Sequence, residues 1–288
     1  MKITLAEHYG LCFGVRDALR QAEDLAQAGP LTILGELVHN PVVRERLAQR
    51  KIGEGALNDF KSAASNRVMI TAHGASNAAR MNWRKAGFEL ADGTCPLVRR
   101  AHEELAALVR VGCFPVVIGK RDHVEVQGLI GDFPGAHVIE YRNEVFDLPP
   151  HARYGIISQT TQPIEKVREI VEAIREAQPE SEICFRDTVC QPTKNRQQAL
   201  RALISKVDTM VVVGGRGSNN TLQLAAVASN AGLRVFHIER AEELCVEWFT
   251  DAREVGVTAG TSTLKETVRD VFGWLCRLAD SRNEELAR

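Results

Sequence analysis

Three cysteines of this 288-residue chain stand in turn-like stretches, beside glycine, proline, aspartate or threonine, and they are Cys12, Cys95 and Cys190. Cys95 is followed by Pro96 and a helical pattern over residues 99–109, so we expect it at the start of a helix. Unpaired backbone N–H groups and the helix dipole favour the thiolate at such a position. The other cysteines lie in apolar or helical stretches and are interpreted as core packing: Cys113, Cys184, Cys245 and Cys276.

These three cysteines mark an internal repeat. Each is followed, after 27 or 28 residues, by a polar residue at the end of a predicted strand, and this set is His39, His123 and Ser218. A second set follows each cysteine after 61 to 72 residues and comprises His73, Thr160 and Ser262. Asp92 and Asp187, interpreted as turn or cap residues, each stand three residues before a cysteine. The spacing predicts three related α/β units of roughly ninety residues.

Strands and helices alternate along all three units, which is typical of parallel sheets with helical crossovers. The predicted strands cover residues 2–6, 31–34, 66–71, 114–118, 138–141, 154–157, 182–185, 209–213, 233–238 and 254–258. The predicted helices cover residues 16–28, 99–109, 163–177, 196–205 and 264–280, with others after Pro41, Ser76, Glu125 and Asn220. We therefore predict an α/β fold with three lobes, 13–95, 96–189 and 190–288, the last joined by an N-terminal strand within residues 1–12.

The strand-end loops indicate where a ligand binds. Parallel α/β sheets carry their ligand loops at the carboxyl ends of the strands. Nine such loops in three matching sets predict pseudo-symmetric lobes with mainly parallel sheets around one central site. Three separate modules are the alternative, but the sequence lacks the linkers rich in glycine, proline or serine that separate modules need.

The composition restricts the partner and the compartment. Hydrophobic residues make up 44% and charged residues 25%, with a formal net charge of −1, so no bulk field favours nucleic acid or an anionic membrane. No apolar stretch approaches the roughly 20 residues of a membrane helix, and residues 1–8 lack the apolar core of a signal peptide. The odd number of seven cysteines argues against a disulfide framework, and the lack of a CxxC pair argues against a zinc ribbon or a thioredoxin-like site. We expect a cytoplasmic protein that binds neither nucleic acid nor membrane.

Three thiolates brought together from three lobes can hold a soft metal centre. Zinc with three cysteine ligands and an open position is one alternative. An iron–sulfur cluster in which one iron lacks a cysteine ligand is the favoured interpretation. Such an iron is a Lewis acid that can bind a substrate oxygen and pass electrons to it.

The remaining loops offer hydrogen-bond donors, several just before helices, where backbone N–H groups also suit a phosphate or diphosphate. The candidate donors are His39, His73, His123, Thr160, Ser218, Asn219, Asn220 and Ser262. Glu125 is the only carboxylate within residues 123–125 and is the candidate proton donor. Residues 214–217 (GGRG) do not fit the dinucleotide fingerprint, and the lysine of a P-loop is missing.

Taken in order, these motifs resemble the LytB-type 4-hydroxy-3-methylbut-2-enyl diphosphate reductase family, and the resemblance extends over nearly the whole chain. The matching stretches are residues 10–15, 38–40, 72–74, 94–98, 123–125, 159–161, Cys190 with 195–197, 218–220 and 258–262. So many matches in the same order are highly specific.

The resemblance implies a cofactor, a substrate and a reaction. It implies a [4Fe-4S] cluster held by Cys12, Cys95 and Cys190, with one iron not ligated by cysteine that binds the hydroxyl of an allylic diphosphate substrate. The residues implied to hold the diphosphate are His39, His73, Ser218, Asn219, Asn220 and Ser262. Glu125, with His123 and Thr160, is implied to deliver protons. Two electrons from ferredoxin or flavodoxin then expel water and give isopentenyl and dimethylallyl diphosphate.

Several residues depart from the family pattern. The departures are Gly93 for the usual alanine, Val124 for proline, Asn219 for serine, Thr261 and Leu264 for alanine and proline, and the charged run Lys120, Arg121 and Asp122. They leave every implied ligand and Glu125 in place, but they keep open a related reductase of the same fold with a different substrate. A non-catalytic iron–sulfur or zinc protein that senses redox state or binds a partner is the third alternative.

Overall fold

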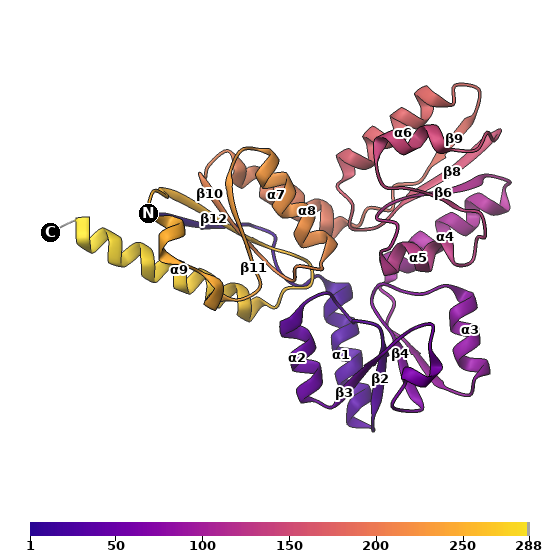
Figure 1. Ribbon diagram of the computed structural model, residues 1–288, viewed down its shortest axis with the longest axis horizontal. Helices are drawn as coiled ribbons and strands as arrows, with labels where there is room; N and C mark the ends of the chain where they lie inside the picture. The colour runs from indigo at the N-terminus through magenta and orange to yellow at the C-terminus, as the bar shows by residue number, and fades with distance from the viewer. Residues whose placement is uncertain (287–288) are drawn as a thin grey trace. The chain divides into compact units, whose positions relative to one another are not determined.

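The computed structural model, which describes residues 1–286, contains three parallel β-sheets of four strands each (Figure 1). The sheet orders are β1-β12-β10-β11, β3-β2-β4-β5 and β7-β6-β8-β9. Every strand pair is parallel, so each link between neighbouring strands is a crossover. Reading the first sheet from its other edge makes all three orders equivalent. The predicted α/β fold with three pseudo-symmetric, parallel sheets is confirmed.

The first sheet combines the two ends of the chain. Its strands are β1 (Lys2–Leu5), β12 (Glu254–Ala259), β10 (Thr209–Val213) and β11 (Arg234–Ile238). Along β10 the side chains alternate between two cores. Val211 and Val213 face α9 (Lys265–Leu286), while Met210 and Val212 face α7 (Gln191–Ile204) and α8 (Asn219–Asn230). This period-2 alternation explains why a run of apolar residues is buried on both faces.

The second sheet follows directly along the chain. Its strands are β2 (Leu31–Leu34), β3 (Ile52–Gly55), β4 (Arg67–Ile70) and β5 (Glu89–Asp92). The helices in this part are α1 (Phe13–Gln27), α2 (Pro41–Gln49) and α3 (Asn77–Lys85). Trp83 of α3 is fully buried in a core with Val68 and Ile70 of β4, and its indole N–H donates to the carbonyl of Leu57 at 2.7 Å. Such a hydrogen bond removes the cost of burying the one polar atom of tryptophan.

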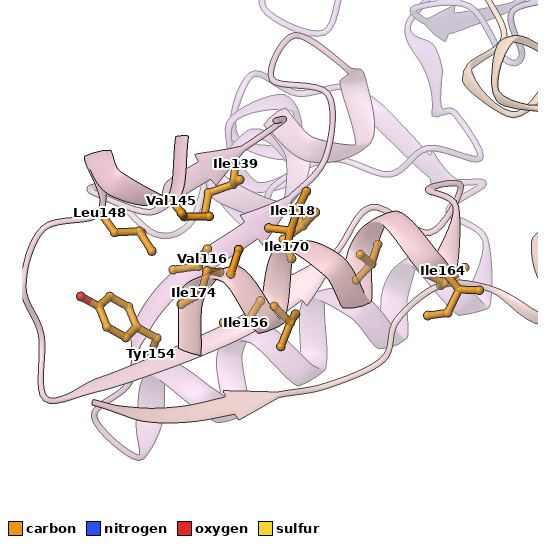
Figure 2. Close-up of a cluster of buried hydrophobic side chains, with 14 residues drawn as sticks. Val116, Ile118, Ile139, Val145, Leu148, Tyr154, Ile156, Ile164, Ile170 and Ile174 are labelled. Atoms are coloured by element: carbon orange, nitrogen blue, oxygen red, sulfur yellow. The ribbon is translucent and has the colours of Figure 1, made fainter. Parts of the chain in front are cut away.

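The third sheet has the same construction. Its strands are β6 (Phe114–Ile118), β7 (His137–Ile139), β8 (Arg153–Ser158) and β9 (Glu182–Phe185). Figure 2 shows the core on one face, where Val116, Ile118 and Ile156 meet Ile170 and Ile174 of α6 (Ile164–Ala177). The opposite face is covered by α4 (Pro96–Arg110) and α5 (Val124–Ile130).

Internal contacts divide the described chain into two compact units. The first unit comprises Met1–Phe13, Val38–Arg46 and the chain from Gln191, and the second comprises Gly14–Leu37 and Leu47–Cys190. The second unit therefore contains two of the three sheets. Within the first unit, β1 pairs with β12, as Lys2 lies opposite Glu254. The three lobe boundaries stay a prediction.

Element boundaries differ from the predicted ranges at a few places. Strand β3 was not predicted, because its sequence IGEG has two glycines and only one buried apolar side chain, Ile52. Helices α1, α4 and α7 begin earlier than predicted, at Phe13, Pro96 and Gln191. In α4 and α7 a proline stands in the first turn, where its missing N–H has no helical partner to lose. Strand β7 is shorter than predicted, and α9 extends beyond residue 280.

Candidate functional site

The three candidate ligand cysteines occupy equivalent positions in the three sheets. They follow β1, β5 and β9, which are the matching edge strands. The backbone N–H of each donates to a carbonyl just beyond the neighbouring strand, at 3.0 Å for Cys12, 3.1 Å for Cys95 and 3.0 Å for Cys190. The acceptors are Thr261, Ala72 and Thr160 in that order. The repeat seen in the sequence is therefore also a repeat of backbone hydrogen bonding.

All seven cysteines of the described chain are free thiols. Cys12, Cys95 and Cys190 are partly buried, so none of the three is enclosed in a hydrophobic core. Cys113 is buried, as expected for core packing. The same interpretation is wrong for Cys245, which is exposed and immediately precedes the short 3-10 helix Val246–Phe249.

Gly14 provides the surface on which the Cys95 sulfur rests. A Cβ added at Gly14 would overlap the Cys95 sulfur and lie 3.1 Å from the Cys95 Cβ. Gly14 is buried in the first turn of α1, two residues after Cys12 in the chain. The second glycine of the GLCFGV stretch, Gly14, is therefore required because a sulfur approaches the helix backbone closely.

We expect Gly14→Ala to displace the Cys95 side chain, because the new methyl group occupies the space of its sulfur. Overpacking of this kind costs about 1–3 kcal/mol of stability. The measurement is the free energy of unfolding together with the alkylation rate of Cys95, and that rate should rise. Gly273→Ala in α9 is the control, because its methyl group meets only the end of Arg277 at 3.5 Å. Equal effects of the two substitutions would contradict the explanation.

Glu125 is buried in the second unit, with 1% of its surface exposed. Its carboxylate accepts two hydrogen bonds from Thr160, one from the backbone N–H at 2.6 Å and one from the hydroxyl at 3.1 Å. Burial raises the pKa of Glu125 to about 7, although both hydrogen bonds from Thr160 act to lower it. A carboxyl group with this pKa can both hold and release a proton near neutral pH.

His123 lies beside Glu125, and His73 packs against His123, in the same unit. His123 caps the N-terminus of α5, where its Nδ1 accepts the N–H of Glu125 at 3.1 Å. Because Nδ1 is an acceptor, the neutral ring carries its proton on Nε2. The His73 ring stands nearly perpendicular to that of His123, with centroids 5.4 Å apart. The second unit thus brings together four residues predicted from the sequence, namely His73, His123, Glu125 and Thr160.

The raised pKa of Glu125 predicts a pH-dependent cost in stability. The carboxyl group favours its protonated form in the folded protein, so its contribution is fully present below pH 4.5 and is lost as the pH rises through about 7. Glutamine at this position does not titrate. Between pH 4.5 and pH 8 the Glu125→Gln variant should therefore gain about 3 kcal/mol relative to the parent chain. Urea unfolding at the two pH values measures this, and a difference independent of pH would contradict it.

The first unit holds a second group of candidate residues around the N-terminus of α8. Ser218 caps this helix by accepting the N–H of Thr221 at 3.4 Å, and Asn219 and Asn220 form its first turn. The Asn220 Oδ1 accepts the N–H of Thr261 at 3.0 Å. Its Nδ2 is buried and has no hydrogen-bond acceptor among the described residues. A buried donor of this kind at a helix N-terminus suits an anionic oxygen.

His39 and Ser262 belong to this group as well. The Ser262 hydroxyl donates to Ser218 Oγ at 3.4 Å, and its carbonyl accepts Asn40 Nδ2 at 2.9 Å. Gly215 lies directly against the carbonyl of His39, so that any side chain at Gly215 would collide with it. Asn40 was not among the candidate site residues, although it belongs to the matching stretch of residues 38–40. Its place in the repeated strand-end loop was the signal that could have identified it.

Arg196 is another functional candidate that residue-by-residue reasoning missed. Its side chain is buried in the first unit and donates to the carbonyls of Pro192, at 2.8 Å, and Gly10. It therefore ties the start of α7 to the turn that carries Cys12. The only sequence signal was its position shortly after Cys190 in the motif of residues 195–197.

The predicted site residues fall into two groups, one in each compact unit. The first unit contains Cys12, His39, Ser218, Asn219, Asn220 and Ser262. The second contains His73, Cys95, His123, Glu125, Thr160 and Cys190. One central site formed by both groups stays a prediction.

Some of the departures from the family pattern can be placed in the structure. A Cβ at Gly93 would overlap Met69 Cε and lie 2.6 Å from the carbonyl of Ile70, so the methionine fills the space that an alanine methyl group needs. Lys120 and Arg121 are exposed, and Arg121 pairs with Glu144 at 3.2 Å. Leu264 is buried.

The fold and its residues define a class of α/β proteins in which three parallel sheets each present a cysteine turn and polar strand-end loops. Comparison with known protein families identifies one family within this class. The sequence profile of the LytB protein family matches residues 3–276, and the chain belongs to this family.

Curated relatives match nearly the full length of the chain. A 4-hydroxy-3-methylbut-2-enyl diphosphate reductase from Geotalea uraniireducens is 35% identical over 285 residues, which cover 98% of this chain and 100% of that protein. The protein of the same name from Geobacter sulfurreducens is 37% identical over 275 residues, which cover 94% and 96%.

Solved structures share the fold. The E-1-hydroxy-2-methyl-but-2-enyl-4-diphosphate reductase of Plasmodium falciparum superposes with a TM-score of 0.88 at 24% identity, over 95% of this chain and 87% of that one. The structure of an (E)-4-hydroxy-3-methyl-but-2-enyl diphosphate reductase gives a TM-score of 0.69 at 32% identity, over 96% of this chain and 99% of that one. Within residues 1–286, no helix combines the length and apolar character needed to cross a membrane.

Proposed function

We propose that this chain reduces 4-hydroxy-3-methylbut-2-enyl diphosphate to isopentenyl and dimethylallyl diphosphate, the reaction for which its curated relatives are named. The observation that carries the proposal is the Glu125–Thr160 pair, which holds a buried carboxyl group with a pKa of about 7. The same Thr160 accepts the N–H of Cys190 through its carbonyl. A proton donor and a candidate metal ligand are therefore fixed by one residue.

The residues present fit an iron–sulfur cluster. Cys12, Cys95 and Cys190 are reduced, partly buried and held by equivalent hydrogen bonds, and Gly14 leaves room for the Cys95 sulfur. We assign these three as ligands of a [4Fe-4S] cluster with one iron that lacks a cysteine ligand. When bound, the cluster supplies electrons and a Lewis-acidic iron.

The protons come from the chain's own residues. Thr160 orients the Glu125 carboxyl group through its N–H and hydroxyl, and the protonated form present near pH 7 donates to the substrate's hydroxyl as it leaves as water. His123 offers its Nε2–H as a further donor beside Glu125. The reaction consumes two electrons and two protons. One proton leaves in water and the other forms the new C–H bond of the product.

The diphosphate is assigned to the donors of the strand-end loops. The Asn220 Nδ2, the Ser218 and Ser262 hydroxyls and the N-terminus of α8 supply donors and a positive dipole in the first unit. His39, His73 and Asn219 complete the proposed set. The electron donor is a small redox protein such as ferredoxin or flavodoxin. The proposed compartment is the cytoplasm, where cysteines stay reduced.

Anaerobic purification with iron and sulfide analysis, a visible spectrum and a turnover assay tests the proposal. We expect a brown protein with about four irons and four sulfides. After chemical reduction it should convert the allylic diphosphate to both isoprenoid products. A colourless protein with one zinc would contradict the cluster. A loaded, reduced protein that forms no isoprenoid product would overturn the substrate assignment and favour the related reductase with a different substrate.

A further inference from the structure

Arg80 occupies an unusual position in α3, because its guanidinium group is directed inward and only 12% of its side chain is exposed. Its Nε donates to Asp92 Oδ2 at 3.2 Å, and its Nη2 donates to the Thr94 hydroxyl at 2.9 Å. Its Nη1 donates to the backbone carbonyl of Ala75. One side chain thus contacts three acceptors in three directions, which only the planar fork of an arginine can do.

These acceptors belong to the two loops of the second unit that carry His73 and Cys95. Ala75 is two residues after His73, and Thr94 immediately precedes Cys95. The loops are already joined by the hydrogen bond from the N–H of Cys95 to the carbonyl of Ala72. Arg80 adds a second connection, and together the two fix the relative position of both loops.

Asp92 completes this arrangement. Its Oδ1 accepts the N–H of Thr94 at 3.0 Å and also the Thr94 hydroxyl, so the turn before Cys95 is closed. Burial acts to raise the pKa of Asp92, but hydrogen bonds from Thr94 and the charge of Arg80 outweigh it and hold the pKa below its ordinary value. The expectation that Asp92 is a turn residue is correct but incomplete, since it also anchors Arg80.

The turn before Cys190 is built differently, although it is the counterpart of the Cys95 turn. Asp187 accepts the N–H of Val189 at 3.1 Å, as Asp92 does for Thr94. Its turn is joined to the neighbouring strand by the Thr188 hydroxyl, which donates to the carbonyl of Ser158 at 2.6 Å. The Thr188 hydroxyl therefore connects the Cys190 turn to its neighbouring strand, whereas the guanidinium group of Arg80 connects the Cys95 turn to its neighbouring loop.

The N-terminus of α3 is fixed as firmly as Arg80 fixes its middle. The Asp132 carboxylate accepts the N–H groups of Asn77, at 2.7 Å, and Ala78, at 3.0 Å. Asp132 follows α5, the helix whose first turn contains Glu125. An anion at a helix N-terminus is favourable, so Asp132 fixes the start of α3 against the end of α5. Arg80 therefore acts from a helix that is itself anchored to the one carrying the proton donor.

We propose that Arg80 is a positioning residue that fixes the Cys95 thiol and the His73 loop relative to one another through Thr94 and Ala75. Its importance for the reaction rests on the proposed function. Its effect on the geometry of Cys95 does not, so the two can be tested separately.

The test compares Arg80→Met with Arg84→Met, which changes an exposed arginine one turn further along α3. The first readout is the loss of visible absorbance when the anaerobically purified chain is exposed to air. Removing a residue that supports metal ligands typically lowers metal affinity or activity by about 10- to 100-fold. We therefore expect the cluster to decay about tenfold faster in Arg80→Met. The electron paramagnetic resonance spectrum of the reduced protein should also change. Arg84→Met should match the parent in both.

The second readout needs no cluster. In the metal-free full-length chain, the alkylation rate of Cys95 should rise several-fold in Arg80→Met, while that of Cys190 stays unchanged. Arg80→Lys keeps the charge but cannot reach three acceptors, so it should restore the parent behaviour only in part. If Arg80→Met does not fold, Thr94→Val removes only one hydroxyl group and should give the same changes at smaller size.

The outcomes separate the two proposals. If the parent chain holds no cluster, the proposed function is overturned. A selective rise of Cys95 alkylation in Arg80→Met would still support the role of Arg80. Unchanged decay, spectrum and alkylation in Arg80→Met would overturn the role of Arg80. Equal increases at Cys95 and Cys190 would do so as well, because they indicate general loosening of the fold.

Discussion

Replacing Glu125 with glutamine is expected to lower the turnover of the allylic diphosphate by about 100- to 10,000-fold, the range typical of a lost general acid. Glutamine has the same shape, and its carbonyl oxygen can still accept the N–H that Thr160 donates at 2.6 Å. It cannot release a proton to the departing hydroxyl group. The measurement is the single-turnover rate with a chemical reductant, at equal iron and sulfide content.

The control makes the same substitution at Glu169, an exposed residue of α6 that forms an ion pair with the exposed Arg142 at 3.8 Å. Glu169→Gln should keep the parent rate. If Glu125→Gln, with a full cluster, also keeps most of the parent rate, the proton donor is assigned wrongly. Such a result would favour the non-catalytic alternative, in which a buried carboxyl group has no proton to deliver.

The fold could be predicted from the sequence because the repeat is marked by chemically distinctive residues. Cysteines at matching offsets, with polar strand-end residues between them, showed that three units follow one plan. Strand β3 shows the limit of this reasoning, because the glycines of IGEG give no apolar alternation and its position is set by pairing with β2. A four-residue segment does not contain enough information to predict which strand it pairs with.

The candidate site could be predicted only in part, for a related reason. Residues such as Glu125 and Asn220 stand at strand ends and helix starts, where position alone suggests a role. Arg80 stands in the middle of a helix among other charged residues, and nothing in its neighbourhood indicates that it points inward. Its acceptors are 12 and 14 residues away along the chain at Asp92 and Thr94, so only the folded backbone reveals them. The same holds for Gly14. A side chain is excluded there by the sulfur of Cys95, which is distant in the sequence.

The equivalence of the three cysteine turns predicts that Cys12→Ser, Cys95→Ser and Cys190→Ser each abolish the cluster to the same degree. All three backbone N–H groups donate to matching carbonyls at 3.0 to 3.1 Å, so the three turns share the same backbone hydrogen bond. A serine hydroxyl is a hard, poorly ionised ligand that does not replace a thiolate on iron. Iron and sulfide content after anaerobic reconstitution should therefore fall by about tenfold or more in each variant.

Cys245→Ser and Cys113→Ser are the matched controls, one exposed and one buried, and both should keep the parent iron content. A fall in Cys113→Ser alone would report damage to the core rather than loss of a ligand, and its lowered free energy of unfolding would identify it. An intact four-iron cluster in Cys95→Ser would break the assignment at its centre, because the sulfur packed against Gly14 would then have no ligand role. Unequal losses would instead mean that equivalent backbone turns do not make equivalent ligands, and the threefold repeat would describe the scaffold alone.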